Sequence, residues 1–444
     1  MAADGKDSGN VRRISRRDLL KGLVTLGGGL LTGRALLSWL AGEAPRAQTL
    51  DLTPRSYLPY VSRSVPPTPT ATPTATATPT STPTATPTAT ATPTPGSTPQ
   101  PGSSRVVHVH AANATSWDFS TGWYGDYVNQ SVVNTMVEEG LKALTGTNSV
   151  QAAWQQLLPN YRSGQVIAIK VNFNNSTCTD SDNVIDGLIE PVNALIATLK
   201  SFGVAESDIW IFDASRALPN RFVNGCLYSG VRFFDDISKG CREDATFTSN
   251  DPNAEVTFQA SDLKNRRLTD VVINADYLIN VPIMKDHGIS GVTLGLKNHF
   301  GTIEYVQGAG NDNLHYYINP TNSLYSTSYS PLVDICLNPH IRDKTVLVLG
   351  DGLFGALGNT NTEPRRWSTF GDQAPNSLFL SSDQVAVDCV MLDILDAEPV
   401  YHPQAGHRDD YLKLAAQAGL GTYERGDPWG SGYTQIDYRR VEVS

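Results

Sequence analysis

The sequence predicts an α/β protein with a mainly parallel sheet flanked by helices and an irregular insertion around 214–268. Three observations support this class. Short runs rich in Val and Ile lack polar alternation, which is typical of parallel strands buried on both faces. Segments with helical apolar periodicity separate these runs. The succession of strand, helix and strand over 166–213 is typical of a βαβ unit.

The individual elements follow from these patterns. The expected strands, which are the short apolar runs, are 106–110, 166–173, 208–213, 277–283 and 345–349. The expected helices, which have apolar residues at helical spacing, are 130–144, 186–202, 291–300 and 383–395. Gly203 provides a C-terminal stop for the second of these helices. Residues 214–268 have poor periodicity, and we expect an insertion there with small strands such as 231–234 and 255–258.

The composition divides the chain into a globular domain, 105–444, and a preceding Pro/Thr-rich linker, 48–104. Residues 66–104 are almost only Pro, Thr, Ala, Ser and Gly, so they cannot bury a core. The proline spacing favours extended polyproline II. The dense threonine is typical of a solvated spacer or of an O-glycosylated stalk.

Residues 1–47 resemble a twin-arginine signal peptide. Residues 15–21 read Ser-Arg-Arg-Asp-Leu-Leu-Lys, which matches Ser-Arg-Arg-x-Phe-Leu-Lys except at Leu19, and a Gly-rich apolar stretch follows. The resemblance implies the twin-arginine translocase as a partner and a periplasmic, extracellular or cell-surface location. Cleavage of the signal and its retention as an anchor both stay open, although Lys21 and Arg34 make it a poor membrane span. We expect no transmembrane domain in the mature chain.

The charge pattern argues against nucleic acid and anionic membranes as partners. The chain has 34 Lys+Arg and 44 Asp+Glu, and ten of the basic but only five of the acidic residues precede residue 105. The globular part is therefore acidic, whereas nucleic-acid binding depends on clustered Lys and Arg.

Five cysteines lie in the globular part. They include no Cys-x-x-Cys, so the sequence has no iron–sulfur cluster motif. Cys226 and Cys241 are close in sequence, and we expect them to form a disulfide in an exported protein. Cys336 and Cys389 lie in apolar helical patterns and are expected to be buried thiols, whereas Cys178 lies in a polar loop.

Residues 277–304 carry a candidate ligand site. Lys285 and His287 follow an apolar strand, and a Gly-rich turn leads into the expected helix 291–300, where Thr293 and Lys297 would share a face and Asn298 follows. Ligands bind beyond the carboxyl ends of parallel strands, and helix starts attract anions. These side chains therefore suit a carboxylate or a phosphate. The alternative is structural, with the lysines in surface ion pairs and the histidine capping a turn.

This stretch resembles the signature of the family known as domain of unknown function 362 (DUF362). That signature reads Asn-Val-Pro-x-x-Lys-x-His, followed by Thr-Leu-x-Leu-Lys-Asn-x-Phe-Gly. The resemblance extends to Lys170 and Asn172 at an early strand end, to Asp351 in an Asp-Gly turn and to the helix start 382–388. The family's biochemical role is not established, so the resemblance implies no reaction. Many relatives carry a Cys-rich iron–sulfur segment that is missing here, which argues against electron transfer.

The same segments can be placed on one edge of the sheet. Lys170, Lys285, Asp351 and Asp383 each lie near an expected strand end or helix start, and parallel strands present these ends to the same side. Asp383 is also a natural helix N-cap. Asp388, inside that helix, would be partly buried and needs a partner, for which a lysine of the signature is the candidate.

A second resemblance is to the nickel-pincer lactate racemases. His287 and Lys297 are ten residues apart across a Gly-containing turn, as are a proton-exchanging His and a cofactor-linked Lys in those enzymes. The resemblance implies that His287 is an acid/base, that Lys297 attaches the cofactor, and that His299 or His315 is a metal ligand. The Gly-Ser-His-Arg-type segment of those enzymes is missing here.

The resulting hypothesis is an exported protein that binds an anionic small molecule or cofactor and acts as an enzyme, with His287 as the acid/base because its ordinary pKa is near neutrality. The expected catalytic residues are His287, Lys297 and Asp351. The expected ligand-binding residues are Lys170, Asn172, Lys285, Thr293, Asn298 and Asp383. One alternative is a non-catalytic binding protein, and another is a cell-surface structural module, which predicts dispersed lysines without a shared cavity. Substrate, cofactor and metal stay open.

Overall fold

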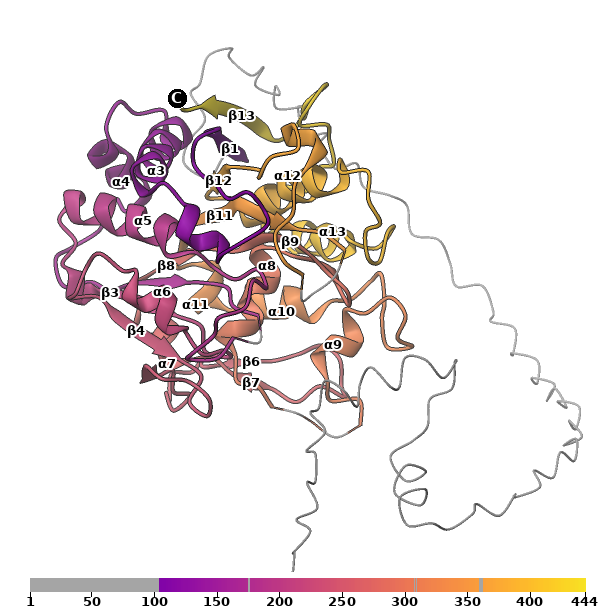
Figure 1. The fold of residues 1–444 in the computed structure, drawn as a ribbon. Coiled ribbons are helices and arrows are strands. Elements are labelled where there is room, and N and C mark those ends of the chain that lie inside the picture. Colours follow the sequence, from indigo (N-terminus) through magenta and orange to yellow (C-terminus); the bar gives the residue numbers. More distant parts are fainter. Residues whose placement is uncertain (1–103, 175, 307, 309, 359–361) are drawn as a thin grey trace, which may run out of the picture. The chain divides into compact units, whose positions relative to one another are not determined.

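The computed structural model describes residues 104–174, 176–306, 308, 310–358 and 362–444. These residues form a mixed, mostly parallel sheet of 11 strands with helices on both faces, which confirms the predicted α/β class (Figure 1). The expected signal peptide and almost all of the linker lie outside the described residues.

The sheet is built from eleven short segments spread over the whole domain. They are β1 (Arg105–His110), β2 (Ile167–Lys170), β3 (Ile209–Phe212), β4 (Arg232–Asp235), β5 (Glu243–Asp244), β8 (Tyr277–Asn280), β9 (Ile283–His287), β10 (Gly291–Thr293), β11 (Thr345–Ala356), β12 (Ser377–Ser381) and β13 (Asp437–Glu442). Their order is β13-β1-β12-β11-β8-β2-β3-β4-β5, and β9 pairs with both β11 and β10. The strands from β11 to β5 are parallel, whereas β12 runs antiparallel to β1 and β11.

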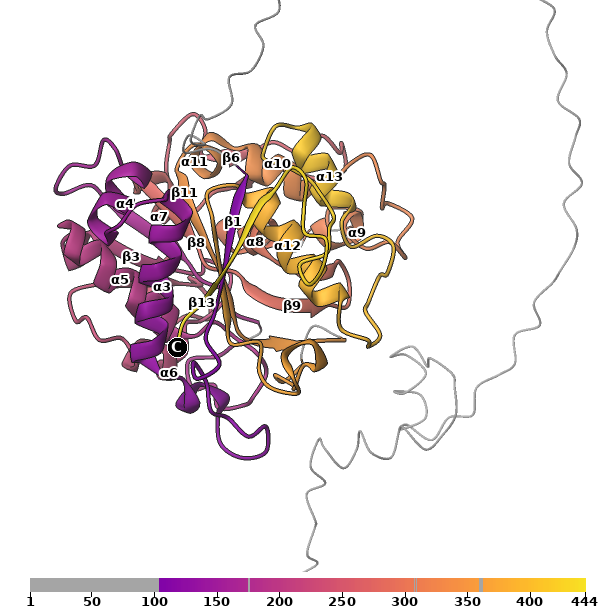
Figure 2. The same ribbon diagram turned by 90° about the horizontal axis from the view of Figure 1, so that it is seen from above.

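Two layers of helices cover this sheet (Figure 2). The first layer contains α3 (Gln130–Thr145), α4 (Val150–Leu157) and α5 (Ile189–Phe202), and the second contains α10 (Pro331–Leu337), α12 (Gln384–Asp396) and α13 (Asp410–Gln417). Shorter helices are α6 (Asn220–Asn224), α7 (Asp270–Asn274), α8 (Gly295–Asn298), α9 (Leu314–Tyr317) and α11 (Pro339–Arg342).

The two layers explain why the strands have continuous apolar sequences. Ile167 and Ile169 of β2 pack into the same apolar cluster as α3 and α5, whereas Ala168 between them packs into a cluster on the opposite face. Successive side chains of a strand point to opposite faces, so both sets must be apolar when both faces are covered. The helices predicted at 130–144 and 383–395 are confirmed, and α5 ends before Gly203, as expected.

The prediction of a helix over 291–300 is wrong. Residues Gly291–Thr293 form strand β10, which pairs antiparallel with β9 in a tight hairpin, and α8 begins only at Gly295. Val292 and Thr293 are β-branched and lie in a fully buried hairpin, where such side chains pack well. Thr293 and Lys297 therefore do not share a helix face.

The region 214–268 contains short elements, as expected, and it also contributes to the main sheet. β4 and β5 extend the parallel edge beside β3, while β6 (Glu255–Val256) and β7 (Arg266–Arg267) form a separate two-stranded sheet.

The expected pairing of Cys226 with Cys241 is wrong, because Cys178 forms the disulfide with Cys241. The loop that carries Cys178 packs against the start of α6, where its carbonyl accepts a hydrogen bond from the Asn220 N–H at 2.8 Å. This contact is between segments distant in sequence, which closeness along the chain does not reveal. Cys336 and Cys389 are buried free thiols, as predicted.

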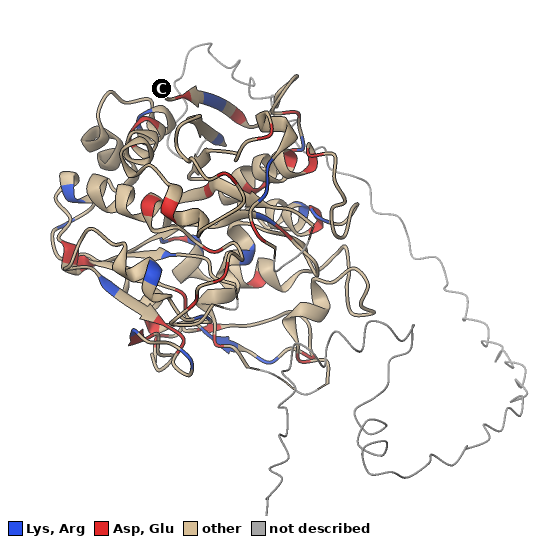
Figure 3. Cartoon of the chain, viewed as in Figure 1, with Lys and Arg blue, Asp and Glu red and all other residues tan. Residues whose placement is uncertain are grey.

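None of the described helices combines the length and the apolar character that crossing a membrane requires. Figure 3 shows basic and acidic residues interspersed over the described part of the chain in that view, rather than separated by sign.

Candidate functional site

The hairpin of β9 and β10 places three of the predicted site residues on one face. Lys285 pairs with Thr293, and His287 pairs with Gly291. Directly paired residues and residues two apart on a strand share a face, so Lys285, His287 and Thr293 point the same way. All three are buried and line the same cavity.

The ends of β2 and β3 form the adjoining part of the site. Lys170 is the last residue of β2, and Asp213 directly follows β3, so the two lie at the same edge of the sheet. The Lys170 ammonium donates to Asp213 Oδ2 at 3.2 Å, to Asn298 Oδ1 at 3.0 Å and to the Val171 carbonyl at 2.6 Å. Burial lowers the pKa of Lys170, and Asp213 opposes this effect by stabilising its charge.

Asn298 joins this edge to helix α8. Its Oδ1 also accepts a hydrogen bond from Asn172 at 2.8 Å, and its Nδ2 donates to Asn280 Oδ1 at 2.7 Å. Asn280 is the last residue of β8, so one carboxamide links the ends of two strands to the helix that carries Lys297. The predicted residues Lys170, Asn172 and Asn298 are thus brought together in one hydrogen-bonded network.

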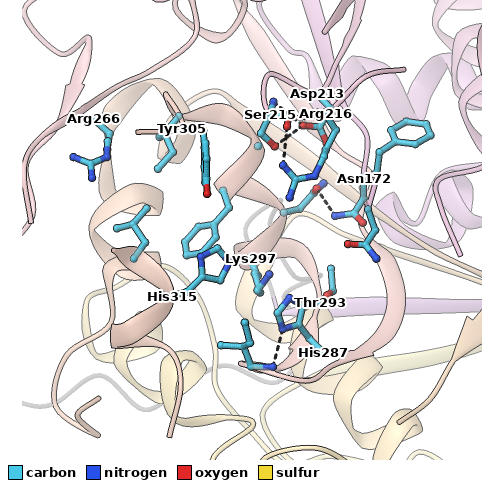
Figure 4. Close-up of a pocket in the computed structure, with 18 of the residues that line it drawn as sticks. Asn172, Asp213, Ser215, Arg216, Arg266, His287, Thr293, Lys297, Tyr305 and His315 are labelled. Carbon is cyan, nitrogen blue, oxygen red and sulfur yellow. Dashed lines mark hydrogen bonds between the residues drawn. The ribbon is translucent and has the colours of Figure 1, made fainter. Parts of the chain in front are cut away.

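A cavity of about 290 Å³ opens between this network and the hairpin (Figure 4). The described lining residues include four with basic side chains, Arg216, Arg266, Lys285 and Lys297, and two with acidic ones, Asp213 and Glu304. Asp213 is bound by Lys170, and Arg266 is bound by Asp312 at 2.6 Å. The rest of the wall includes His287, His315 and apolar groups such as Phe300 and Ile289.

Both lysines of the cavity wall have pKa values below that of an ordinary lysine. Burial, with repulsion from Lys285 and Arg216, lowers the pKa of Lys297 to about 7. Burial likewise lowers the pKa of Lys285 to about 8, against the stabilising charge of the buried Asp186 carboxylate. Among the described residues, Lys297 makes no hydrogen bond or ion pair, and its ammonium lies 5.3 Å from the centre of the Phe300 ring.

His287 both caps a turn and lines the cavity. Its Nδ1 accepts hydrogen bonds from the backbone N–H groups of Ile289 and Ser290, each at 3.2 Å, so the proton of the neutral ring is on Nε2. Burial and the nearby ammonium groups of Lys297 and Lys285 hold its pKa well below the usual value. His287, whose ordinary pKa is near neutrality, is therefore a neutral Nε2–H donor at physiological pH in this environment.

Two further polar groups in the wall have buried atoms without a hydrogen-bond partner. The hydroxyl of Thr293 has none among the described residues, although the residue is only 4% exposed. The Nε of Arg216 is also unpaired, while its Nη1 donates to the Ser215 carbonyl at 2.7 Å. Buried polar groups normally have a hydrogen-bond partner, so we expect these two atoms to bind a molecule that enters the cavity.

Asp351 and Asp383 do not line the cavity. Asp351 lies within β11, where burial raises its pKa to about 7 and the Leu353 N–H donates to its Oδ1 at 3.1 Å. Asp383 is the N-cap of α12 and accepts from the N–H groups of Val385 and Ala386. A strand end or a helix start near the sheet edge is thus not sufficient to place a side chain in the site.

The expected partner of Asp388 is also wrong. Its carboxylate accepts from the N–H groups of Gly295 at 2.7 Å and of Leu296 at 3.0 Å, rather than from a lysine. These two N–H groups begin α8, so the helix start that was expected to attract a ligand anion is already bound by a carboxylate of the protein.

Sequence reasoning missed several residues of the wall. Asp213, Ser215 and Arg216 follow β3 in the same way that Asn172 follows β2, and this position after a parallel strand was a usable signal. His315, which the second resemblance implied as a possible metal ligand, lies on α9 in the wall, and burial together with Lys297 lowers its pKa to about 4.

A metal site does not follow from the histidines of this region. His299 is fully buried, and burial together with Lys170 lowers its pKa to about 3. Within the described ranges, no group of three or more His, Cys, Asp or Glu residues is arranged to hold a metal ion.

Comparisons with known proteins give a family, and they also give matches among solved structures. A family model described as a domain of unknown function (DUF362) matches residues 167–393. The lactate racemase apoprotein from Thermoanaerobacterium thermosaccharolyticum has 12% identity and a TM-score of 0.33, over 65% of this chain and 57% of that one. A protein from Thermotoga maritima has 12% identity and a TM-score of 0.30, over 62% and 60%. The chain thus spans less than two thirds of either structure. No curated protein matches it.

Proposed function

The chain belongs to the DUF362 family, and from this premise we propose that it binds a small anionic molecule in the cavity between the β9–β10 hairpin and the ends of β2 and β3. The observation that carries the proposal is the excess of cationic groups facing one cavity, among them two buried lysines. Lys285, Lys297 and Arg216 meet there, whereas the Asp213 carboxylate is already bound by Lys170.

The electrostatics of the wall support an anion. Repulsion from neighbouring cations contributes to the lowered pKa of Lys297, His287 and His315. A bound anion reverses the sign of this effect, because an opposite charge nearby stabilises the protonated form. Binding of an anion against Lys285, whose pKa is about 8, should therefore be accompanied by proton uptake at that lysine near pH 8.

The dimensions of the cavity limit the ligand. A volume of about 290 Å³ is at the small end of the range of ligand pockets, roughly 300–1,000 Å³. The unpaired Thr293 hydroxyl and the Nε2–H of His287 can bind a second oxygen of the ligand, while Phe300 and Ile289 provide apolar contact. A compact carboxylate or phosphate with a further polar group satisfies all of these features.

Calorimetric titration of the full chain with phosphate, acetate and glycolate tests this proposal. We expect at least one of these anions to bind, and Lys285→Met to weaken its binding about ten- to a hundredfold, the value of a charge-assisted hydrogen bond. Titration in buffers of different ionisation enthalpy measures the proton uptake.

Lys239→Met, at an exposed position that does not line the cavity, is the matched control and should bind like the wild type. Absence of binding for all three anions, or equal binding by the wild type and Lys285→Met, contradicts the proposal.

The same cavity suits an enzyme or a non-catalytic binding protein. In an enzyme, His287→Gln keeps ligand binding and removes turnover, whereas in a binding protein there is no turnover to remove. A purely structural module predicts dispersed lysines, but Lys285 and Lys297 line one cavity, which favours the two ligand-binding alternatives.

We further propose that the chain is exported by the twin-arginine route. The Ser-Arg-Arg-Asp-Leu-Leu-Lys segment supports this, and so does the Cys178–Cys241 disulfide, because such bonds persist mainly in oxidising compartments. Replacing Arg16 and Arg17 together with Lys should leave the protein in the cytoplasm of a bacterium with the translocase. Unchanged export of this variant contradicts the route.

A further inference from the structure

Lys297 has an unusual environment for a lysine. Only 8% of its surface is exposed, and within the described part of the chain its ammonium has no hydrogen-bond or ion-pair partner. The described charged and titratable groups that share the cavity with it are Lys285, Arg216, Arg266, His287, His315, Asp213, Glu304 and Tyr305. Most of these groups are cationic or can become so, and they disfavour a positive charge on Lys297.

We propose that the Lys297 amine is a nucleophile that forms an imine with the carbonyl group of a small anionic aldehyde or ketone. This inference rests on the proposed function, because the anion site is what brings the carbonyl carbon to the amine. Lys285 and Arg216 hold the anionic group of the ligand, which leaves Lys297 free for the second functional group.

The protonation state of Lys297 supports this role. An ordinary lysine, with a pKa of 10.5, is almost entirely an ammonium ion at neutral pH and has no lone pair to donate. Burial and the neighbouring cations lower the pKa of Lys297 to about 7, so a large fraction is free amine. Desolvation and an adjacent cationic group are the two means by which proteins activate a lysine for imine formation.

The reaction balances without a further reagent. The amine lone pair forms a bond to the carbonyl carbon, the π electrons move to the oxygen, and one proton moves from nitrogen to that oxygen to give a carbinolamine. The oxygen then takes a second proton and leaves as water, and the nitrogen loses its remaining proton to give a neutral imine. The carbonyl carbon keeps its oxidation level, because C=O is replaced by C=N, and no oxidant or reductant is needed.

The wall supplies groups for both stages. The Nε2–H of His287 and the hydroxyl of Thr293 are donors on the hairpin face and can bind the carbonyl oxygen as negative charge develops on it. The Lys285 ammonium, on the same face and with a pKa of about 8, is mostly protonated at neutral pH and can give a proton to the departing oxygen.

Reductive trapping tests the inference. The full chain is incubated at neutral pH with glyoxylate and cyanoborohydride, which reduces imines, and the modified residue is located by peptide mass mapping. We expect one reduced adduct on Lys297, loss of this adduct in Lys297→Arg, and an unchanged adduct in the exposed control Lys239→Met. Propionaldehyde, which has no anionic group, should label Lys297 more slowly.

The titration with glycolate, which has no carbonyl group to attack, separates this inference from the proposed function. Lys297→Arg keeps a positive charge and should still bind glycolate. Glycolate binding without labelling of Lys297 by glyoxylate overturns the imine and leaves the anion site standing. Labelling spread over exposed lysines in the wild type also overturns it. Failure of every anion to bind overturns both proposals.

Discussion

Lys170 and Lys297 are both buried lysines at the same edge of the sheet, and their surroundings are opposite. Lys170 uses its three N–H groups on a carboxylate, a carboxamide and a backbone carbonyl. Lys297 has no such partner among the described residues and faces a cavity with other cations. The difference indicates that burial alone does not identify a functional lysine. Lys297 is distinguished because no described residue forms a hydrogen bond or an ion pair with its ammonium group.

The largest expected effect is the loss of stability in Lys170→Met. Removing one partner of a buried ion pair leaves the Asp213 carboxylate uncompensated, which costs about 3–5 kcal/mol. Urea unfolding of the variant and the wild type measures this difference. A change below about 1 kcal/mol, the median for a surface salt bridge, would show that the Lys170 network is not a buried one.

Lys297→Met should change the free energy of unfolding in the opposite direction. In the described part of the chain the wild-type amine is buried without a hydrogen-bond or ion-pair partner, so a methionine of similar length should stabilise the chain, on the order of 1–2 kcal/mol at neutral pH. The same unfolding experiment, with the exposed Lys239→Met as a control, tests this. Destabilisation comparable to that of Lys170→Met would remove the contrast between the two lysines.

The pH dependence of stability should further distinguish Lys297 from Lys170. The pKa of Lys297 is about 7 in the native state and 10.5 for an ordinary lysine, so between these values the unfolded chain binds more protons at this site. Stability of the wild type relative to Lys297→Met therefore rises with pH over this window. Unfolding curves should show the advantage of the variant at pH 7 shrinking toward pH 10, and a constant difference argues against a lowered pKa.

The smallest expected effect concerns the turn after β9. His287→Leu removes the acceptor for two backbone N–H groups, each at 3.2 Å, and should cost about 1 kcal/mol in total, the low end of the range for two hydrogen bonds. His287→Asn places an oxygen where Nδ1 lies and should recover part of this loss. Thermal unfolding measures both, and equal melting temperatures for the two variants would show that the turn does not depend on this cap.

The sequence was sufficient for the parts of the site that depend on strand ends. Lys170 and Asn172 follow the apolar run of β2, and the rule that parallel strands end at one edge places them beside Asn298. The apolar character of the strands, covered by helices on both faces, predicted the α/β class for the same reason. Here local pattern and tertiary structure agree.

Other features depend on contacts that no local pattern encodes. Residues 291–300 contain glycines and branched residues that fit a helix start or a hairpin, and pairing with β9 decides for the hairpin. Cys178 meets Cys241 because two distant loops pack together. The low pKa of His287 and the absence of Asp351 from the cavity depend on burial and on side-chain direction.

Helix α8 is a single turn, which has no stability of its own in water. It is fastened at its start by Asp388, 93 residues further along the chain, and at its end by Asn298. Gly295 permits the first attachment, since a Cβ there would lie 2.8 Å from Asp388 Oδ1. The position of the Lys297 amine therefore depends on α12. Substitutions in that distant helix can change the reactivity of Lys297 even though they alter no residue that lines the cavity.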